Sequence, residues 1–283
     1  MKKKVLKILA LVLAIILIIG IGVFANSLVG NPVSKFLATK NAEEYLEKNF
    51  GDKDFQLQEV TYDFKTGGYY ARVTSPTSID SHFSILLNFI GKVEYDTYDD
   101  VTTGWNTAMR IEEDYRNVVK AITESQDFPY NFHICYGEMQ FAMGDYPLDE
   151  EKPEYALKKS ELELDKVYDI REMGAKAGRL TVYIYDDKVT AERLAEFLLE
   201  IKEKFDKSGV AFKAIDCILE PTNPEDYMTD DDRQVEVKDF LYSDIYEDGL
   251  VERVKKANEE TIEYNKKQNS IKEAEISGQW VGC

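Results

Sequence analysis

The sequence VLKILALVLAIILIIGIGVFA, at residues 5–25, decides how the rest of the chain is interpreted. From residue 8 to residue 25 every position is apolar or glycine. A helix rises about 1.5 Å per residue, so a helix of this length is about as long as a bilayer's hydrocarbon core is thick. A helix also satisfies its own backbone hydrogen bonds in lipid. We therefore predict a transmembrane anchor over residues 8–25.

The side chains expected to contact lipid are spread along this run: Ile8, Leu11, Ile15, Ile18 and Val23. Lysines precede it at positions 2, 3, 4 and 7. Because positively charged flanks stay in the cytoplasm, we expect residues 1–7 to be a cytoplasmic stub. The C-terminal domain then lies outside, in a single-pass cell-membrane protein. The alternative is a signal peptide cleaved after Ala25, but the apolar region of a signal peptide is usually shorter.

The chain is strongly acidic, with a formal net charge of -18 at pH 7. A surface of this sign repels nucleic acid, so we expect no nucleic-acid partner. Hydrophobic residues make up 44% and aromatic residues 12% of the chain, a composition typical of packed cores rather than of disorder. A solvated acidic surface without a specific partner is the simplest interpretation of the charge.

After a polar linker at residues 26–33, the sequence predicts a first α+β module at residues 34–145. The expected elements are a helix at 34–50, an antiparallel meander of strands at 55–64, 69–75 and 82–90, a helix at 107–125 and a strand at 131–143. Ser34 is the predicted N-cap of the first helix. The apolar alternation changes phase between Leu57 and Val60, which indicates a β-bulge or a break in the strand.

A proline-bearing acidic loop at residues 145–153 separates this module from a second one at residues 154–267, which a polar tail follows at 268–283. The expected elements are strands at 161–170, 180–185, 210–219 and 235–241, a short helical turn at 171–176, a helix ending near Gly209, and a final helix starting near Asp244. Thr190 is the predicted N-cap of the first of these helices. Strand, helix and strand with short connections are typical of a crossover between parallel strands. The predicted fold class is α+β.

Four segments carry a resemblance to a known family: GNPVSKFLA at 30–38, EEYLEKNFGDKDFQLQEVTYDFKTGGYYARVTSPTSIDSHF at 43–83, LELDKVYDI at 162–170 and FLYSDIYEDGLVERV at 240–254. The chain resembles the YfjL-like proteins, which are small, membrane-anchored, extracytoplasmic proteins of Gram-positive bacteria with no assigned activity. The resemblance implies the anchor, the exported location and the two-part build. It implies no catalytic residue.

Cysteine and histidine are both scarce. Of the three cysteines, Cys135 and Cys217 lie in apolar strand-like runs and Cys283 ends the chain. We expect buried free thiols at the first two positions, and a disulfide between them is the alternative. The two histidines, His82 and His133, sit in strand-like segments without the spacing of a zinc site.

Acidic clusters offer the remaining candidate site. Asp230, Asp231 and Asp232 could supply oxygen ligands to a divalent cation, although the glycine of an EF-hand is not in register. A solvated acidic loop is the simpler interpretation. Since no motif for a nucleophile or a nucleotide occurs either, we predict no catalytic residue and no cofactor.

These observations predict a non-enzymatic binding or interaction module of the cell envelope, with the bilayer and an envelope protein or peptide as partners. The identity of the ligand stays open. The alternative is an envelope hydrolase that depends on a divalent cation. An enzyme of that kind would need carboxylates or histidines that converge in a concave site.

Overall fold

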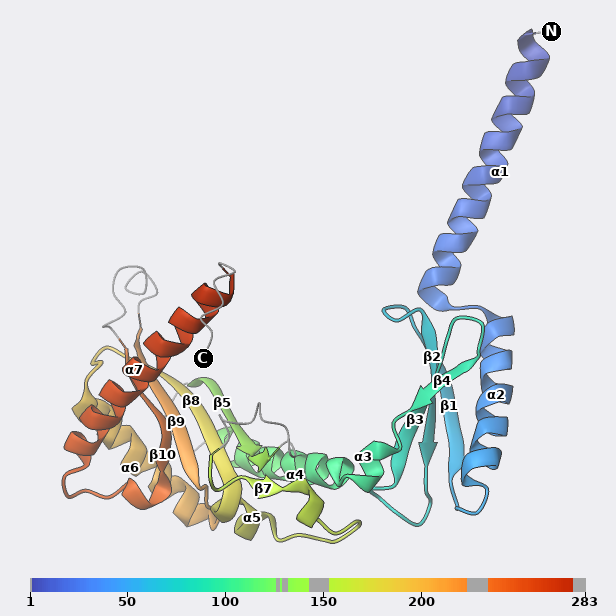
Figure 1. The fold of residues 1–283 in the computed structure, drawn as a ribbon. Helices are drawn as coiled ribbons and strands as arrows, with labels where there is room; N and C mark the ends of the chain where they lie inside the picture. Colours follow the sequence, from blue (N-terminus) through green and yellow to red (C-terminus); the bar gives the residue numbers. More distant parts are fainter. Residues whose placement is uncertain (1, 126–127, 129–131, 143–152, 223–233, 277–283) are drawn as a thin grey trace. The chain divides into compact units, whose positions relative to one another are not determined.

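The computed structural model describes residues 2–125, 128, 132–142, 153–222 and 234–276 (Figure 1). The chain divides into two compact units. Unit 1 comprises Met1–Thr107 with Glu163–Asp165, and unit 2 comprises Ala108–Leu162 with Lys166–Cys283. Each unit contains its own four-stranded sheet and its own apolar core. The fold class is therefore α+β, as predicted.

The chain begins with helix α1, Lys2–Val29. Ile8, Leu11, Ile15 and Ile18 are exposed on it, and the side chain of Val23 lies outside the described part. Among the residues that the structure describes, no helix is both long and apolar enough to cross a membrane. A span needs about 20 consecutive, predominantly apolar residues. This finding contradicts the predicted transmembrane anchor and the single-pass membrane localisation that rested on it.

Unit 1 is an antiparallel meander covered on one face by a helix. Its elements are α2 (Pro32–Phe50), β1 (Gln56–Asp63), β2 (Gly68–Thr74), β3 (His82–Leu87), β4 (Val93–Asp96) and α3 (Asp99–Thr102). The strand order is β1-β2-β3-β4. Ala38, Ala42 and Phe50 of α2 pack against the sheet. The register shifts between Leu57 and Val60, which confirms the predicted irregularity in this strand. Strand β4 falls where the sequence indicated only a connection.

Helix α2 starts earlier than predicted. Its N-cap is Asn31, whose Oδ1 accepts hydrogen bonds from the backbone N of Val33 at 2.8 Å and of Ser34 at 3.4 Å. Pro32 occupies the first turn, where its missing N–H costs no helical hydrogen bond. The prediction of Ser34 as the cap was therefore wrong, because the asparagine and proline before it already start the helix.

Unit 2 is a mixed sheet with the order β10-β9-β8-β5. Its elements are α4 (Trp105–Thr123, shared with the end of unit 1), β5 (Phe132–Met139), β6 (Phe141–Ala142), β7 (Leu157–Lys158), α5 (Ile170–Ala177), β8 (Gly178–Asp186), α6 (Ala191–Ser208), β9 (Ala214–Pro221), β10 (Val235–Leu241) and α7 (Leu250–Ile276). Two 3₁₀ turns lie among its described residues, η1 (Lys159–Glu161) and η4 (Tyr242–Asp244). Strands β8 and β9 are parallel and α6 connects them, as predicted. The hydroxyl of Thr190 caps α6, and Gly209 ends it in the left-handed conformation.

The strand predicted at residues 161–170 is wrong. The chain there passes through η1, and helix α5 begins at Ile170, one residue before the short helical turn predicted at 171–176. The carboxylate of Asp169 caps α5 by accepting from the backbone N of Arg171 at 2.9 Å and of Glu172 at 3.4 Å. A capping side chain of this kind favours a helix start over a continuing strand. The alternation of apolar residues was the weaker signal.

The outer edge of strand β10 is capped by helix α7. The side chain of Asn258 accepts from the backbone N of Glu236 at 2.8 Å, and that of Thr261 accepts from the backbone N of Lys238 at 3.2 Å. The opposite edge of β10 pairs with β9. Both of these edge N–H groups therefore have partners, which an unprotected edge strand would lack.

The short segment Glu163–Asp165 is a strap that returns to unit 1 from the sequence of unit 2. The backbone N of Asp80 donates to Oδ1 of Asp165, and the backbone N of Asp165 donates to Oδ2 of Asp80, both at 3.0 Å. Thr107 Oγ1 also donates to Oδ2 of Asp80 at 2.8 Å. Asp80 is only 1% exposed. The strap therefore completes the hydrogen bonding of a buried carboxylate.

We expect Asp165→Ala to destabilise unit 1 by about 1–3 kcal/mol, the range for a buried polar group that loses its partner. The change removes the acceptor for Asp80 N and leaves alanine at a φ of 60°, a conformation that it adopts less readily than aspartate or asparagine. Urea unfolding of the full chain measures the loss.

Asp165→Asn is the matched control, because it keeps Oδ1 and also tolerates the left-handed conformation. It should stay within about 0.5 kcal/mol of the parent chain, as a change that removes none of these features does. An unchanged unfolding midpoint for Asp165→Ala would contradict the role given to the strap.

Candidate functional site

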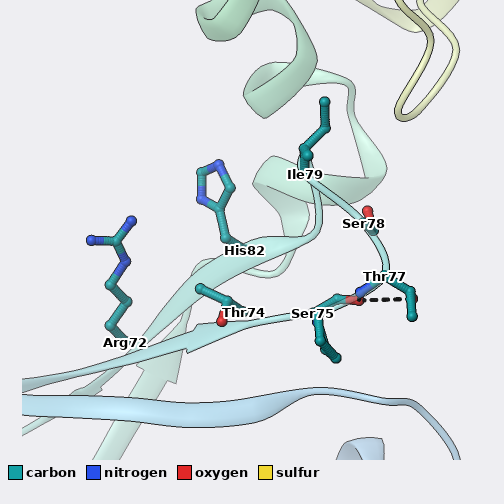
Figure 2. A pocket seen from close by; sticks show the side chains of 8 residues that line it. Arg72, Thr74, Ser75, Thr77, Ser78, Ile79 and His82 are labelled. Atoms are coloured by element: carbon teal, nitrogen blue, oxygen red, sulfur yellow. Dashed lines mark hydrogen bonds between the residues drawn. The ribbon is translucent and has the colours of Figure 1, made fainter.

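A pocket of about 360 Å³ opens where β2 and β3 of unit 1 are joined (Figure 2). The residues that line it are Arg72, Thr74, Ser75, Pro76, Thr77, Ser78, Ile79 and His82. They include one guanidinium, one imidazole and several hydroxyls, with apolar atoms from Pro76 and Ile79. A concave surface with a few polar groups among apolar ones is typical of ligand sites.

The pairing of β2 with β3 places the polar lining residues on one face of the sheet. Thr74 pairs with His82 in the antiparallel register, and Arg72, two pairs further along β2, pairs with Ser84. Successive side chains of a strand point to opposite faces, so the intervening Val73 enters the core beneath α2. Arg72 therefore lies diagonally across from His82, a separation that a long side chain can bridge. Figure 2 shows both side chains projecting to the same side of the strands.

The hydroxyls of the connecting turn are held in structural hydrogen bonds. Asp54 accepts from Ser75 Oγ at 2.8 Å and from Thr77 Oγ1. The bond from Thr77, followed by that from Ser75, lowers the pKa of Asp54. Ser78 Oγ donates to Oδ1 of Asp165 at 2.8 Å. These bonds fix the shape of the turn.

Three polar groups of the lining remain uncommitted within the part of the chain that is described. The guanidinium of Arg72, the hydroxyl of Thr74 and the imidazole of His82 form no hydrogen bond or ion pair there. Burial, and next the charge of Arg72, lowers the pKa of His82 below 6.5. The imidazole is consequently neutral at pH 7, with one nitrogen that donates and one that accepts.

Sequence reasoning did not find this pocket. The sequence placed His82 in a strand-like segment without the spacing of a zinc site, and neither Arg72 nor Thr74 was a candidate. The signal available was the alternation of polar Arg72 and Thr74 with apolar Ala71 and Val73, which indicates an outward face. Nothing in that alternation distinguishes a binding surface from an ordinary solvated one.

The predicted metal ligands cannot be placed. Asp230, Asp231 and Asp232 lie outside the described residues, as does the side chain of His133. Within the described ranges, no group of three or more histidine, cysteine, aspartate or glutamate side chains could hold a metal ion. The metal site at 230–232 stays a prediction from the sequence.

Unit 2 carries a second polar cluster, in which one arginine meets three carboxylates. Arg179 on β8 lies 3.1 Å from Glu138 on β5, 3.7 Å from Asp216 on β9 and 3.7 Å from Asp239 on β10. Tyr155 donates its hydroxyl hydrogen to Asp239 at 2.7 Å. Burial raises the pKa of Asp216. The interactions within this cluster join all four strands of the sheet, and we interpret it as structural.

The two described cysteines are free. Cys135 on β5 and Cys217 on β9 both pair with Val182 of β8, from opposite sides. Neighbouring strands are about 4.8 Å apart, so the two Cα atoms are separated by about twice that distance. A disulfide needs less than about 7 Å, and this fold therefore confirms the prediction of free thiols. Cys283 lies outside the described residues.

Comparison with known proteins identifies two family models. Residues 3–97 match the YfjL-like N-terminal domain, and residues 114–255 match the YfjL-like C-terminal domain. No curated protein and no solved structure matches the chain.

We expect Asp216→Asn to stabilise the protein at pH 7. Because the folded-state pKa of Asp216 is raised, its protonated form favours folding, and that contribution is lost as pH rises from the unfolded pKa through the folded one. Asparagine stays neutral and keeps Oδ1, which accepts from Asp239 N at 2.7 Å. Thermal unfolding should show a gain at pH 7 that shrinks towards pH 3.

Asp187→Asn makes the same change of charge at an exposed site and should leave the unfolding temperature almost unchanged at both pH values. A lower unfolding temperature for Asp216→Asn at pH 7 would mean that the ion pair with Arg179 outweighs the cost of burying the charge.

Neither Cys135 nor Cys217 should react with a thiol reagent in the native state. Burial raises the pKa of Cys135 to about 12 and raises that of Cys217 as well, so almost no thiolate is present at pH 8. Titration with 5,5′-dithiobis(2-nitrobenzoate) in a Cys283→Ser background checks this. Two thiols should appear only after unfolding in guanidinium, and a count of zero would reveal a disulfide.

Proposed function

Because this chain belongs to the YfjL-like family over both of its domains, we propose that it is a non-enzymatic binding module. Its partner is a peptide or protein segment, which enters the pocket of unit 1 between Arg72, Thr74 and His82. We also propose that the protein comes from a Gram-positive bacterium, as the resemblance to this family implies.

The proposal rests on one observation: some polar groups of the pocket are hydrogen-bonded within the protein, and others are not. The hydroxyls of Ser75, Thr77 and Ser78 are engaged in holding the turn. Arg72, Thr74 and His82 are left to face the pocket without bonds of their own among the described residues. A rigid rim around unused hydrogen-bonding groups favours binding, because little conformational freedom is lost when a partner enters.

The same hydrogen bonds favour binding over catalysis. A hydroxyl nucleophile needs a base within hydrogen-bond reach. In this pocket Ser75 and Thr77 donate to Asp54, and Ser78 donates to Asp165. These hydroxyls therefore donate to the carboxylates that hold the turn and not to the imidazole of His82.

No observation in the described part of the chain favours the alternative, a hydrolase dependent on a divalent cation. Its candidate ligands, Asp230, Asp231 and Asp232, lie outside that part. The net charge of -18 supports a partner other than nucleic acid.

A photo-crosslinking amino acid tests the proposal. Ile79 on the rim of the pocket and Phe64 in the turn between β1 and β2 are each 60% exposed. The turn that holds Phe64 precedes β2, and the turn that holds Ile79 comes after it. With the crosslinker at residue 79, the full-length chain in cells of its source organism should give a discrete adduct. The adduct should disappear when Arg72→Gln is added.

The crosslinker at residue 64 is the matched control and should give no such adduct. Equal adducts at the two positions, or none at residue 79, would overturn the pocket as the binding site. An adduct that survives Arg72→Gln would show that the partner contacts the rim without using the pocket.

A further inference from the structure

The uncommitted groups of the pocket differ in the chemistry that they can offer. A guanidinium presents up to five N–H donors in a planar fork that matches the two oxygens of a carboxylate. Arg72 supplies this fork, the hydroxyl of Thr74 supplies a further donor, and the neutral imidazole of His82 supplies one more. These donors lie on one face of two paired strands and line one pocket, where they can serve an acceptor with several lone pairs. An anionic oxygen group meets that requirement.

The surroundings of the pocket favour a single negative charge. The carboxylates of Asp80 and Asp100 act on the pKa of His82 in the direction opposite to Arg72 and to burial. The carboxylate of Asp54 accepts hydrogen bonds from Ser75 and Thr77 of the turn, and the whole chain carries a formal net charge of -18. A dianion such as phosphate would be repelled by these carboxylates about twice as strongly as a monoanion. A carboxylate carries one charge and gains the paired hydrogen bonds to Arg72.

The rim of the pocket favours a carboxylate attached to an apolar residue. Ile79 is 60% exposed, and Pro76 belongs to the same lining. A volume of about 360 Å³ is near the lower end for ligand sites, which suits one terminal residue better than an extended segment. An apolar side chain at that residue would cover Ile79 and remove its exposed surface from water.

From these observations we propose that the pocket of unit 1 binds the C-terminal carboxylate of a peptide. The carboxylate is held by Arg72, Thr74 and His82, and the last side chain packs on Ile79. This inference rests on the proposed function and names the part of the partner that is recognised. Capture of a chain end by a prepared pocket is a general mode of peptide recognition.

The probes are N-acetyl-glycyl-leucine with a free carboxylate and the same peptide with a C-terminal amide. The chain has two histidines, so the imidazole signals of His82 can be followed by NMR in the full-length protein and assigned with His82→Gln. The free acid should shift the His82 signals saturably. It should also raise the pKa of His82, because a negative charge arrives beside the ring. The amide should bind at least about tenfold more weakly, since it lacks the charge-assisted bonds.

Arg72→Gln should abolish the shift, and Arg72→Lys should weaken it, because lysine keeps the charge without the fork. Lys65→Gln is the matched control: it removes one positive charge from an exposed position in the turn between β1 and β2 and should leave binding unchanged. Equal losses in Arg72→Gln and Lys65→Gln would show a general effect of charge and overturn the site.

The remaining outcomes separate this inference from the proposed function. Equal binding of the free acid and the amide would overturn recognition of the carboxylate but leave the binding pocket standing. If sodium acetate binds as tightly as the peptide acid, the pocket recognises small free acids and not a peptide end. If phosphate binds and neither carboxylate does, the argument for a single negative charge is overturned. If no probe shifts the His82 signals and residue 79 gives no adduct, both proposals are overturned.

Discussion

The pocket depends on two aspartates that satisfy each other's backbone. Asp80 ends the turn after β2, and Asp165 lies far along the sequence in the strap. Asn106 adds two further bonds by donating to the backbone oxygens of Asp80 and His82, at 2.9 Å and 2.7 Å. Because His82 opens β3 directly after this arrangement, the position of its imidazole follows from it. The shape of the pocket therefore depends on residues that do not line it.

Much of the fold could be predicted from local signals. The meander of unit 1 follows from turn residues between alternating strands, and the β8-α6-β9 crossover follows from the cap at Thr190 and the glycine at position 209. The errors arise where two local signals compete. Asn31 with the proline after it prevailed over Ser34 as a cap, and Asp169 started a helix where alternation indicated a strand. The apolar run near the N-terminus predicted a membrane span that the described helices do not provide.

The candidate site could not be predicted in the same way. Arg72 and Thr74 have the spacing of any outward-facing pair on a strand, and His82 is brought opposite Thr74 only by the register of two strands. The strap that fixes the turn is separated from Asp80 by 85 positions, and no local pattern in the sequence marks that pairing. Clusters of like residues, such as Asp230–Asp231–Asp232, stand out in a sequence. Sites assembled from single residues on different strands do not.

The cap that α7 places over β10 limits how copies of this chain can associate. With Asn258 and Thr261 already accepting from the N–H groups of Glu236 and Lys238, a strand from another molecule would first have to displace a helix. Continuous sheet growth from one molecule to the next, the route by which many β-proteins form fibrils, is closed at this border. Without the last helix, these two N–H groups of β10 would be free to pair with a strand of another molecule.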